Sequence, residues 1–231
     1  AACLALASCA RERESIRNHP LEFAEGLAPV MRDGRWGYID RAGQIVIPPR
    51  YDRAQAFSEG WAQVFGGGAW QYIDRTGRVA LRRSGGSFHC GLAATYGTQK
   101  CGFMDTNGTM RIPPIYTFVN DFREGLAAVR GTNGCWGYVD THGHLAVDTV
   151  HRTTWDFHEG LASCGLAGNI VYINRRGEIE IDLPDEVIRG LPFSEGLALI
   201  AIGHRNGYID RTGHVVIPPD EKYSYHHRFA D

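Results

Sequence analysis

One sequence pattern recurs six times and constrains the fold more than any other feature of the chain. Each copy begins with a phenylalanine, continues in its clearest form with Glu-Gly-Leu-Ala, and reaches an aromatic segment that ends in Asp or Asn. A glycine follows three residues later, and an alternating aliphatic run comes after it. A fixed period of 31–36 residues indicates a tandem repeat architecture. The six phenylalanines are Phe23, Phe57, Phe88, Phe122, Phe157 and Phe193.

The first copy shows how one repeat is expected to fold. Extended runs at 27–31, 36–40 and 44–47 predict three strands, and Asp40-Arg41-Ala42-Gly43 predicts a type I turn before the third. Pro48-Pro49 is expected to end that strand, because proline removes a ladder donor. Each copy therefore predicts a three-stranded antiparallel meander, with room for a short extra strand in the connector.

Both faces of the central strand are apolar in every copy. The Ile39 position is always aliphatic or Met, and the Tyr38 position, on the opposite face, is always aromatic. Each unit is thus expected to pack against a neighbour on both sides. The fold class predicted is all-β, a tandem array of six units of about 34 residues stacked in a solenoid-like manner. A closed, propeller-like ring is the alternative.

The repeats also predict the division of the chain. Residues 1–20 form a leader remnant and polar tether, and residues 220–231 form a polar tail. The six repeats are expected at 21–54, 55–85, 86–119, 120–154, 155–190 and 191–219. A glycine before each Leu-Ala strand predicts a positive φ or a backbone contact too close for a Cβ atom. These glycines are Gly26, Gly60, Gly91, Gly125, Gly160 and Gly196.

Composition and motifs argue against several functional classes. With a net charge of −2 and no basic patch, the chain is not expected to bind nucleic acid. It contains no nucleophile elbow, phosphate-binding loop or HExxH motif, and its ten histidines have no zinc-site spacing. We therefore predict no catalytic residue, metal or cofactor. An enzyme would need a pocket of residues outside the repeat pattern, such as His151, Trp155 and His158.

Two columns of side chains each allow two interpretations. The carboxylates at the Glu25 position either bind a cation or, as we favour, cap backbone N–H groups beside their own glycine. The aromatic column either binds a sugar or a peptide as a ladder, or forms a second hydrophobic layer between units. Its candidate ligand-binding residues are Trp36, Tyr38, Trp70, Tyr72, Trp136 and Tyr138.

The N-terminal stretch and the cysteines point to export. Leu6-Ala7-Ser8-Cys9 resembles a bacterial lipobox, which predicts lipidation at Cys9. The preceding apolar stretch is too short to span a membrane. Among the remaining cysteines, Cys90–Cys101 and Cys135–Cys164 are the candidate disulfides, with buried free thiols as the alternative.

Phe23-Ala24-Glu25-Gly26-Leu27-Ala28 and Trp36-Gly37-Tyr38-Ile39-Asp40 together resemble the bacterial WG-repeat (KWG) family, and the match covers about residues 21 to 219. The Trp-Gly pair itself is intact only at Trp36-Gly37 and Trp136-Gly137. The resemblance implies β-rich tandem units, often in exported or surface proteins, and a binding role without defined catalytic residues.

We therefore expect a non-catalytic binding or scaffolding module. Its expected partner is a protein or a cell-envelope polymer, and it would touch the membrane only through a lipid anchor at Cys9. The expected location is periplasmic or on the cell surface, with the cytoplasm as the alternative. An enzyme, or a carbohydrate-binding module that uses the aromatic ladder, are the alternative functions.

Overall fold

The computed structural model describes residues 23–220, and the regular elements within this range are 23 β-strands. They form six antiparallel sheets, one for each repeat, and this confirms the predicted all-β tandem array. The chain divides into two compact units at residues 1–83 and 84–231. Sheets 1 and 2 lie in the first unit, and sheets 3 to 6 lie in the second. No helix within residues 23–220 is long and apolar enough to span a bilayer.

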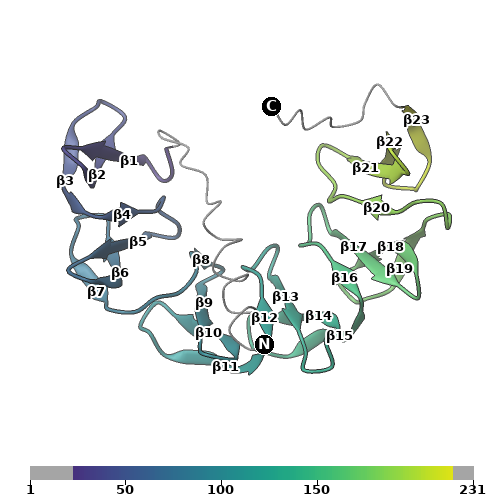
Figure 1. The fold of residues 1–231 in the computed structure, drawn as a ribbon, viewed down its shortest axis with the longest axis horizontal. Coiled ribbons are helices and arrows are strands. Elements are labelled where there is room, and N and C mark those ends of the chain that lie inside the picture. Colours follow the sequence, from purple (N-terminus) through teal and green to yellow (C-terminus); the bar gives the residue numbers. More distant parts are fainter. Residues whose placement is uncertain (1–22, 221–231) are drawn as a thin grey trace, which may run out of the picture. The chain divides into compact units, whose positions relative to one another are not determined.

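The first unit contains two sheets that lie side by side, drawn in purple and blue in Figure 1. Sheet 1 comprises β1 (Leu27–Arg32), β2 (Arg35–Asp40) and β3 (Ile45–Tyr51). Sheet 2 comprises β4 (Arg53–Ala54), β5 (Trp61–Gly66), β6 (Ala69–Asp74) and β7 (Val79–Leu81).

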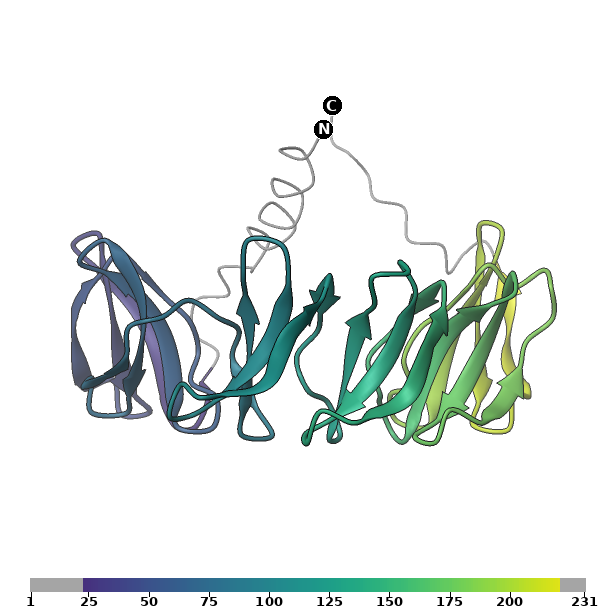
Figure 2. The same ribbon diagram turned by 90° about the horizontal axis from the view of Figure 1, so that it is seen from below.

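The second unit contains four sheets, which follow one another from teal to yellow in Figure 2. Sheet 3 comprises β8 (Phe88–His89), β9 (Leu92–Tyr96), β10 (Cys101–Asp105) and β11 (Met110–Tyr116). Sheet 4 comprises β12 (Phe118–Val119), β13 (Leu126–Arg130), β14 (Trp136–Asp140) and β15 (Leu145–His151). Sheet 5 comprises β16 (Thr153–Thr154), β17 (Leu161–Leu166), β18 (Asn169–Asn174) and β19 (Ile179–Asp182). Sheet 6 comprises β20 (Arg189–Gly190), β21 (Leu197–Ile202), β22 (Arg205–Asp210) and β23 (Val215–Asp220).

Five of the six sheets have a fourth strand, which is the short connector strand for which the prediction left room. The short connector strand β4 pairs with β5 of sheet 2 through Arg53↔Phe65 and Ala54↔Val64. The strands β12, β16 and β20 pair in the same way with the sheet that follows them. The predicted repeat boundaries at 54, 119, 154 and 190 assign each of these strands to the repeat before the one whose sheet it joins. Asp220, assigned to the tail, is the last residue of β23.

Two tight turns recur in each repeat and hold the meander. In the predicted type I turn, the Gly43 N–H donates to the Asp40 carbonyl at 3.0 Å, and the Asp40 carboxylate accepts from the N–H groups of Ala42 and Gln44 at 2.9 Å. The other turn has Glu25 at φ 52° and Gly26 at φ 82°, which is a type I′ hairpin geometry. The predicted positive φ is confirmed for all six glycines of this column.

The third strand does not end at its prolines, contrary to expectation. β3 runs through Pro48-Pro49 to Tyr51, because the prolines lie in a bulge rather than in the ladder. Its register moves from Tyr38↔Ile47 to Trp36↔Tyr51, so four residues of β3 span two of β2. The bulge explains the glycine of the Trp-Gly pair. A Cβ atom on Gly37 would lie 2.4 Å from the Ile47 carbonyl oxygen.

The repeats that lack this glycine also lack the bulge. Gln71 and Val171 occupy the position in sheets 2 and 5, where the third strands end at Leu81 and Asp182. In sheet 5 the register continues without a shift from Tyr172↔Ile181 to Val171↔Asp182. The glycine and the bulged strand therefore occur together within this one chain.

The hydrophobic core lies between consecutive sheets. In the first unit, Tyr38 and Ile47 of sheet 1 form one buried cluster with Phe57, Val64 and Ile73 of sheet 2. Equivalent clusters join sheets 3 and 4, 4 and 5, and 5 and 6 in the second unit. This confirms packing on both faces for the central strands of sheets 4 and 5. The aromatic face of one repeat meets the aliphatic face of the next.

Candidate binding site between the repeats

The tyrosines proposed as a ligand-binding ladder are buried, which corrects that interpretation. Tyr38, Tyr72 and Tyr138 are at most 1% exposed. Tyr38 packs edge-on against Phe57 with ring centroids 4.9 Å apart, and Tyr138 packs in the same way against Phe157 at 4.7 Å. Tyr38 and Tyr138 form the second hydrophobic layer between repeats, and no ligand can reach them without separating the sheets.

The tyrosine hydroxyl groups also bind the next repeat. Tyr38 donates to the Gln55 carbonyl at 2.6 Å, and Tyr172 donates to the Leu191 carbonyl at 2.8 Å. Tyr138 donates to the Trp155 carbonyl at 2.5 Å. Burial raises the pKa of all three phenols well above the ordinary value, so they remain neutral hydrogen-bond donors.

The tryptophans of the proposed ladder, Trp36, Trp70 and Trp136, are half-buried. Trp70 packs edge-on against Phe65 at 5.5 Å, and Trp136 packs against Phe118 at 5.6 Å. Trp70 and Trp136 thus each have an aromatic partner, and Trp36 packs against the core cluster of sheets 1 and 2. A role for these three residues in ligand binding stays a prediction.

The glutamate column caps backbone N–H groups, but in the repeat that follows. The Glu25 carboxylate accepts from the Gly60 N–H at 2.9 Å. The Glu124 carboxylate accepts from the N–H groups of Glu159 at 2.6 Å and Gly160 at 2.9 Å. The predicted glycine cap therefore exists between repeats, whereas the expectation placed it beside each glutamate's own glycine.

Neither candidate disulfide is formed among the described residues. Cys101 pairs with Tyr96, whereas the opposite end of the hairpin pairs Leu92 with Asp105. Cys90 precedes Leu92, so at about 3.3 Å per residue it lies more than about 13 Å from Cys101, beyond the reach of a disulfide. The Cys164 thiol instead contacts the hydroxyl groups of Thr154 at 3.2 Å and Tyr138 at 3.6 Å.

Histidines gather at one exposed turn of sheet 4. The His142 and His144 rings stack with centroids 6.0 Å apart, and His144 Nδ1 lies 3.1 Å from Asp140 Oδ2. Across residues 23–220 no group of three or more His, Cys, Asp or Glu side chains has a metal-binding arrangement. Cys9, the predicted lipidation site, lies outside the described residues, as does the predicted tail beyond Asp220.

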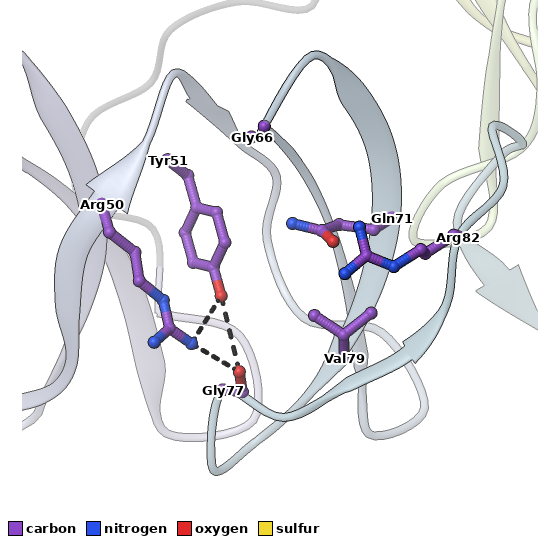
Figure 3. Close-up of a pocket in the computed structure, with 8 residues that line it drawn as sticks. Arg50, Tyr51, Gly66, Gln71, Gly77, Val79 and Arg82 are labelled. Atoms are coloured by element: carbon purple, nitrogen blue, oxygen red, sulfur yellow. Dashed lines mark hydrogen bonds between the residues drawn. The ribbon is translucent and has the colours of Figure 1, made fainter.

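A pocket of about 450 Å³ lies between sheets 1 and 2 of the first unit, as Figure 3 shows. On one side, Arg50 Nη2 donates to the Gly77 carbonyl at 2.7 Å and contacts the Tyr51 hydroxyl at 2.9 Å. Gln71 and Arg82 line the other side. The eight lining residues are Arg50, Tyr51, Gly66, Gly67, Gln71, Gly77, Val79 and Arg82.

The missing bulge of the second repeat changes the lining of this pocket. Because β7 ends at Leu81, Arg82 leaves the sheet where the other repeats continue their third strand. Gln71 replaces the glycine that the bulge would require, and its side chain is only 7% exposed. Gly66 keeps the space open, because a Cβ atom there would lie 3.0 Å from the Tyr51 ring.

A second pocket, of about 480 Å³, occupies the equivalent position between sheets 3 and 4. Tyr116 takes the place of Tyr51, and Ile115 takes the place of Arg50. Its polar side is neutral, with the Asn133 amide donating to the Thr149 carbonyl at 2.8 Å. The same inter-repeat position therefore carries cationic side chains in one pair of repeats and neutral ones in the other.

Sequence reasoning did not find either pocket. The signal available for the first was the departure of the second repeat from the pattern, since Gln71 replaces glycine where no Pro-Pro follows. The sequence does not show that Arg50, from the preceding repeat, faces the same space as Arg82. An enzyme was expected to need a pocket of non-repeat residues such as His151, Trp155 and His158. Neither of these two pockets is lined by any of the three.

Together, the six sheets and the cores between them define a tandem β-repeat protein. The family model described as "WG containing repeat" matches residues 36–70, 102–134 and 207–230. The predicted resemblance is confirmed at these segments. A β-rich repeat module of this kind suggests a role in binding or scaffolding. No protein of curated function matches the chain.

Several solved structures share the fold at low sequence identity, and these neighbours are β-propeller-like repeat proteins. The computationally designed Ika8 protein has a TM-score of 0.57 at 13% identity, over 87% of this chain and 73% of that one. BamB from Moraxella catarrhalis has a TM-score of 0.51 at 13% identity, over 86% and 74%. Hsv2 of Kluyveromyces lactis has a TM-score of 0.50 at 6% identity, over 82% and 73%.

Proposed function

We propose that the chain is a non-catalytic binding or scaffolding module that recognises a protein or a cell-envelope ligand. One observation carries the proposal: the carboxylates of Glu25, Glu124 and Glu159 and of the turn aspartates bond to backbone N–H groups of the array, whereas the inter-repeat pockets differ. Glu124 caps the next repeat and Asp40 caps its own turn, so neither carboxylate is left for chemistry. A catalytic constellation would require such groups to converge in one pocket.

We further propose that the protein is exported by a bacterium and held at the membrane by a lipid on Cys9. The support is the sequence Leu6-Ala7-Ser8-Cys9 alone. Metabolic labelling with a fatty acid, after expression behind a complete leader, should mark the wild type and leave Cys9→Ser unlabelled. An unlabelled wild type recovered from the cytoplasm would contradict the anchor and leave the binding role untouched.

Binding is tested by co-sedimentation of residues 23–220 with envelope fractions of the source bacterium. We expect saturable retention by the cell-wall fraction or by the membrane fraction, and recovery of both components with unchanged mass. Digestion of the fraction with protease before mixing distinguishes the two ligand classes, because it removes a protein ligand and spares a polymer. Absence of saturable retention by every fraction would overturn the proposal.

The carbohydrate alternative is tested in the same assay with the half-buried tryptophans. Trp136→Phe keeps an aromatic ring against Phe118 but shortens the exposed edge. If a polysaccharide stacks on this edge, retention by protease-treated cell wall should fall at least about fivefold, within the range for one aromatic stacking contact. Unchanged retention would exclude Trp136 from the binding surface.

A further inference from the structure

We propose that the pocket between sheets 1 and 2 binds a small ligand that carries a carboxylate and an apolar or amide body. This inference rests on the binding function proposed above and names a ligand class for one of its sites. The argument uses the charges that line the pocket, the bonds already made by those charges, and the equivalent pocket between sheets 3 and 4.

The charge of the lining favours an anion. Two of its eight residues are arginines and none is Asp or Glu. Guanidinium groups stay protonated at every physiological pH, so this space carries two fixed positive charges. The carboxylate of Asp52, which directly follows Tyr51, is paired with the Arg35 guanidinium outside the pocket. The pocket charge is thus not balanced by an acidic residue in its wall.

The two arginines differ in the hydrogen bonds that their guanidinium groups make within the protein. Arg50 is fixed by the Gly77 carbonyl and lies with its guanidinium carbon 5.1 Å from the centre of the Tyr51 ring. The Arg82 side chain is exposed, and no residue of the described chain makes a hydrogen bond or ion pair with its guanidinium. Arg50 therefore shapes the wall, and Arg82 is the group available to an incoming ligand.

The hydrogen-bond donors of Arg82 and Gln71 are sufficient to satisfy the two oxygens of one carboxylate. A guanidinium binds both oxygens of a carboxylate through two parallel N–H groups. The buried Gln71 amide lines the same side as Arg82 and offers a further donor. A phosphate group, with more acceptor oxygens and a higher charge, would leave several of them without donors here. One carboxylate is the anion that this side of the pocket satisfies best.

The remaining walls match an apolar or amide body. The Tyr51 ring and Val79 supply apolar surface, and Gly66, Gly67 and Gly77 supply backbone without side chains. A volume of about 450 Å³ exceeds the need of an inorganic ion and lies within the range of small-molecule sites. An N-acylated dipeptide with a free carboxylate has the appropriate size and chemistry.

The experiment measures binding of an N-acetylated dipeptide of two aliphatic residues, by changes in the amide NMR signals of the full chain. We expect shifts at Gly66, Gly67 and the Gln71 side chain, and at least tenfold weaker binding of the same dipeptide with a C-terminal amide. Arg82→Gln should weaken binding of the acid at least tenfold, and Arg82→Lys should weaken it less. Arg111→Gln, an exposed position of sheet 3 with the same change in charge, is the matched control and should leave binding unchanged.

Three results would overturn the proposal: equal binding of acid and amide, no effect of Arg82→Gln, or shifts centred on Thr132 and Asn133 of the second pocket. Displacement of the dipeptide by inorganic phosphate at equal concentration would also overturn it, since the site would then bind any anion. An octapeptide that ends in the same two residues tests the source of the carboxylate. Its binding points to a protein terminus, and its exclusion points to a small molecule.

The result of the dipeptide experiment can be distinguished from the result of the envelope-binding experiment that tests the proposed function. If Arg82→Gln abolishes dipeptide binding but leaves envelope retention intact, the pocket is a distinct site within a module that still binds elsewhere. If the dipeptide fails to bind and envelope retention persists, only the assignment of a carboxylate ligand to this pocket is contradicted, and the proposed binding function stands.

Discussion

The carboxylate of Glu124 accepts a hydrogen bond from the backbone N–H of Gly160 at 2.9 Å, across the interface between sheets 4 and 5. The same relation joins Glu25 to Gly60 and Glu159 to Gly196. Each glutamate sits in a two-residue turn with φ near +50°, and this conformation points its carboxylate at the equivalent turn of the next repeat. The turn that begins one repeat is thereby bonded to the turn that begins the next.

We expect Glu124→Ala to reduce the free energy of unfolding by about 1 kcal/mol more than Glu195→Ala, because hydrogen bonds to an exposed carboxylate contribute on this order. Glu195 occupies the same turn position with φ 54°, but its carboxylate has no hydrogen-bond partner within residues 23–220. Both variants lose the same local turn preference. The difference between their losses in free energy of unfolding therefore measures the contribution of the cap between repeats. Chemical denaturation measures it, and equal losses would show that the cap contributes nothing.

The glycine of the Trp-Gly pair should tolerate no side chain. A Cβ atom on Gly137 would lie 2.4 Å from the Val147 carbonyl oxygen and 2.7 Å from the Asp148 backbone. Gly137→Ala should therefore destabilise the protein by about 3 kcal/mol or more, through displacement of the bulged strand. Val171→Ala, at the same position of a repeat without the bulge, should cost about 1–2 kcal/mol from lost burial. Thermal unfolding compares the two, and a smaller loss for Gly137→Ala would contradict the bulge argument.

A β-branched residue at Gly125 should destabilise the centre of the array. Gly125 has φ 78°, and its Cβ atom would lie 3.2 Å from the Arg175 guanidinium. We expect Gly125→Val to cost at least about 2 kcal/mol, against less than about 0.5 kcal/mol for Arg41→Val at an exposed turn position. Because repeats unfold partly independently, the variant should show two thermal transitions or a proteolytic cut between the third and fifth repeats. Wild-type melting and protease resistance would refute this.

The stability of the protein should fall as the pH decreases below about 6.5, because His151 is buried in its neutral form. Burial lowers its pKa from 6.5, and its Nδ1 atom is buried without a hydrogen-bond partner among residues 23–220. The unfolded chain therefore takes up the proton first, and the contribution of His151 is complete above its unfolded pKa and lost as the pH falls toward the folded one. Equilibrium denaturation between pH 5 and pH 8, roughly the range in which histidine titrates, measures this dependence.

His151→Tyr is the control for this pH dependence, because Tyr51 and Tyr116 occupy the same position in the first and third repeats. The variant should lose the dependence in this range. The carboxylates of Asp74 and Asp210 affect stability in a separate, more acidic pH range. The Thr76 hydroxyl is the main cause that lowers the pKa of Asp74, and Thr212 does the same for Asp210. The contribution of both carboxylates is therefore complete above the ordinary pKa of a carboxyl group and is lost as the pH falls from there through the lowered pKa. An identical slope for wild type and His151→Tyr would contradict the assignment.

The four cysteines of the repeats should react as thiols in order of their exposure. Cys90 is exposed and Cys135 is half-buried, whereas Cys101 and Cys164 are buried. Maleimide should modify Cys90 first in the native protein, then Cys135, and should reach Cys101 and Cys164 only after unfolding. Peptide mass mapping without reductant measures this order. A recovered peptide pair that links Cys90 to Cys101 would contradict the fold of sheet 3.

The sequence alone determined the strand order within each repeat and the turns that join the strands. These depend on local properties: alternation with a period of two residues, aspartate capping of the turn at Asp40, and a positive φ that glycine tolerates at Gly26. It also determined that both faces of the central strand must be covered. Such features repeat within the chain, so six imperfect copies gave the same information six times.

Only the tertiary structure decided which groups meet across repeats. The partner of Glu124 lies 36 residues away, and the partner of Tyr38 lies 17 residues away, so the stacking of the sheets and not local preference brings them together. The same reason explains why Tyr38 is core rather than binding surface, and why Pro48-Pro49 forms a bulge rather than an end. The pocket of Arg50 and Arg82 combines the end of one repeat with the shortened strand of the next, and a sequence read one repeat at a time cannot place them together.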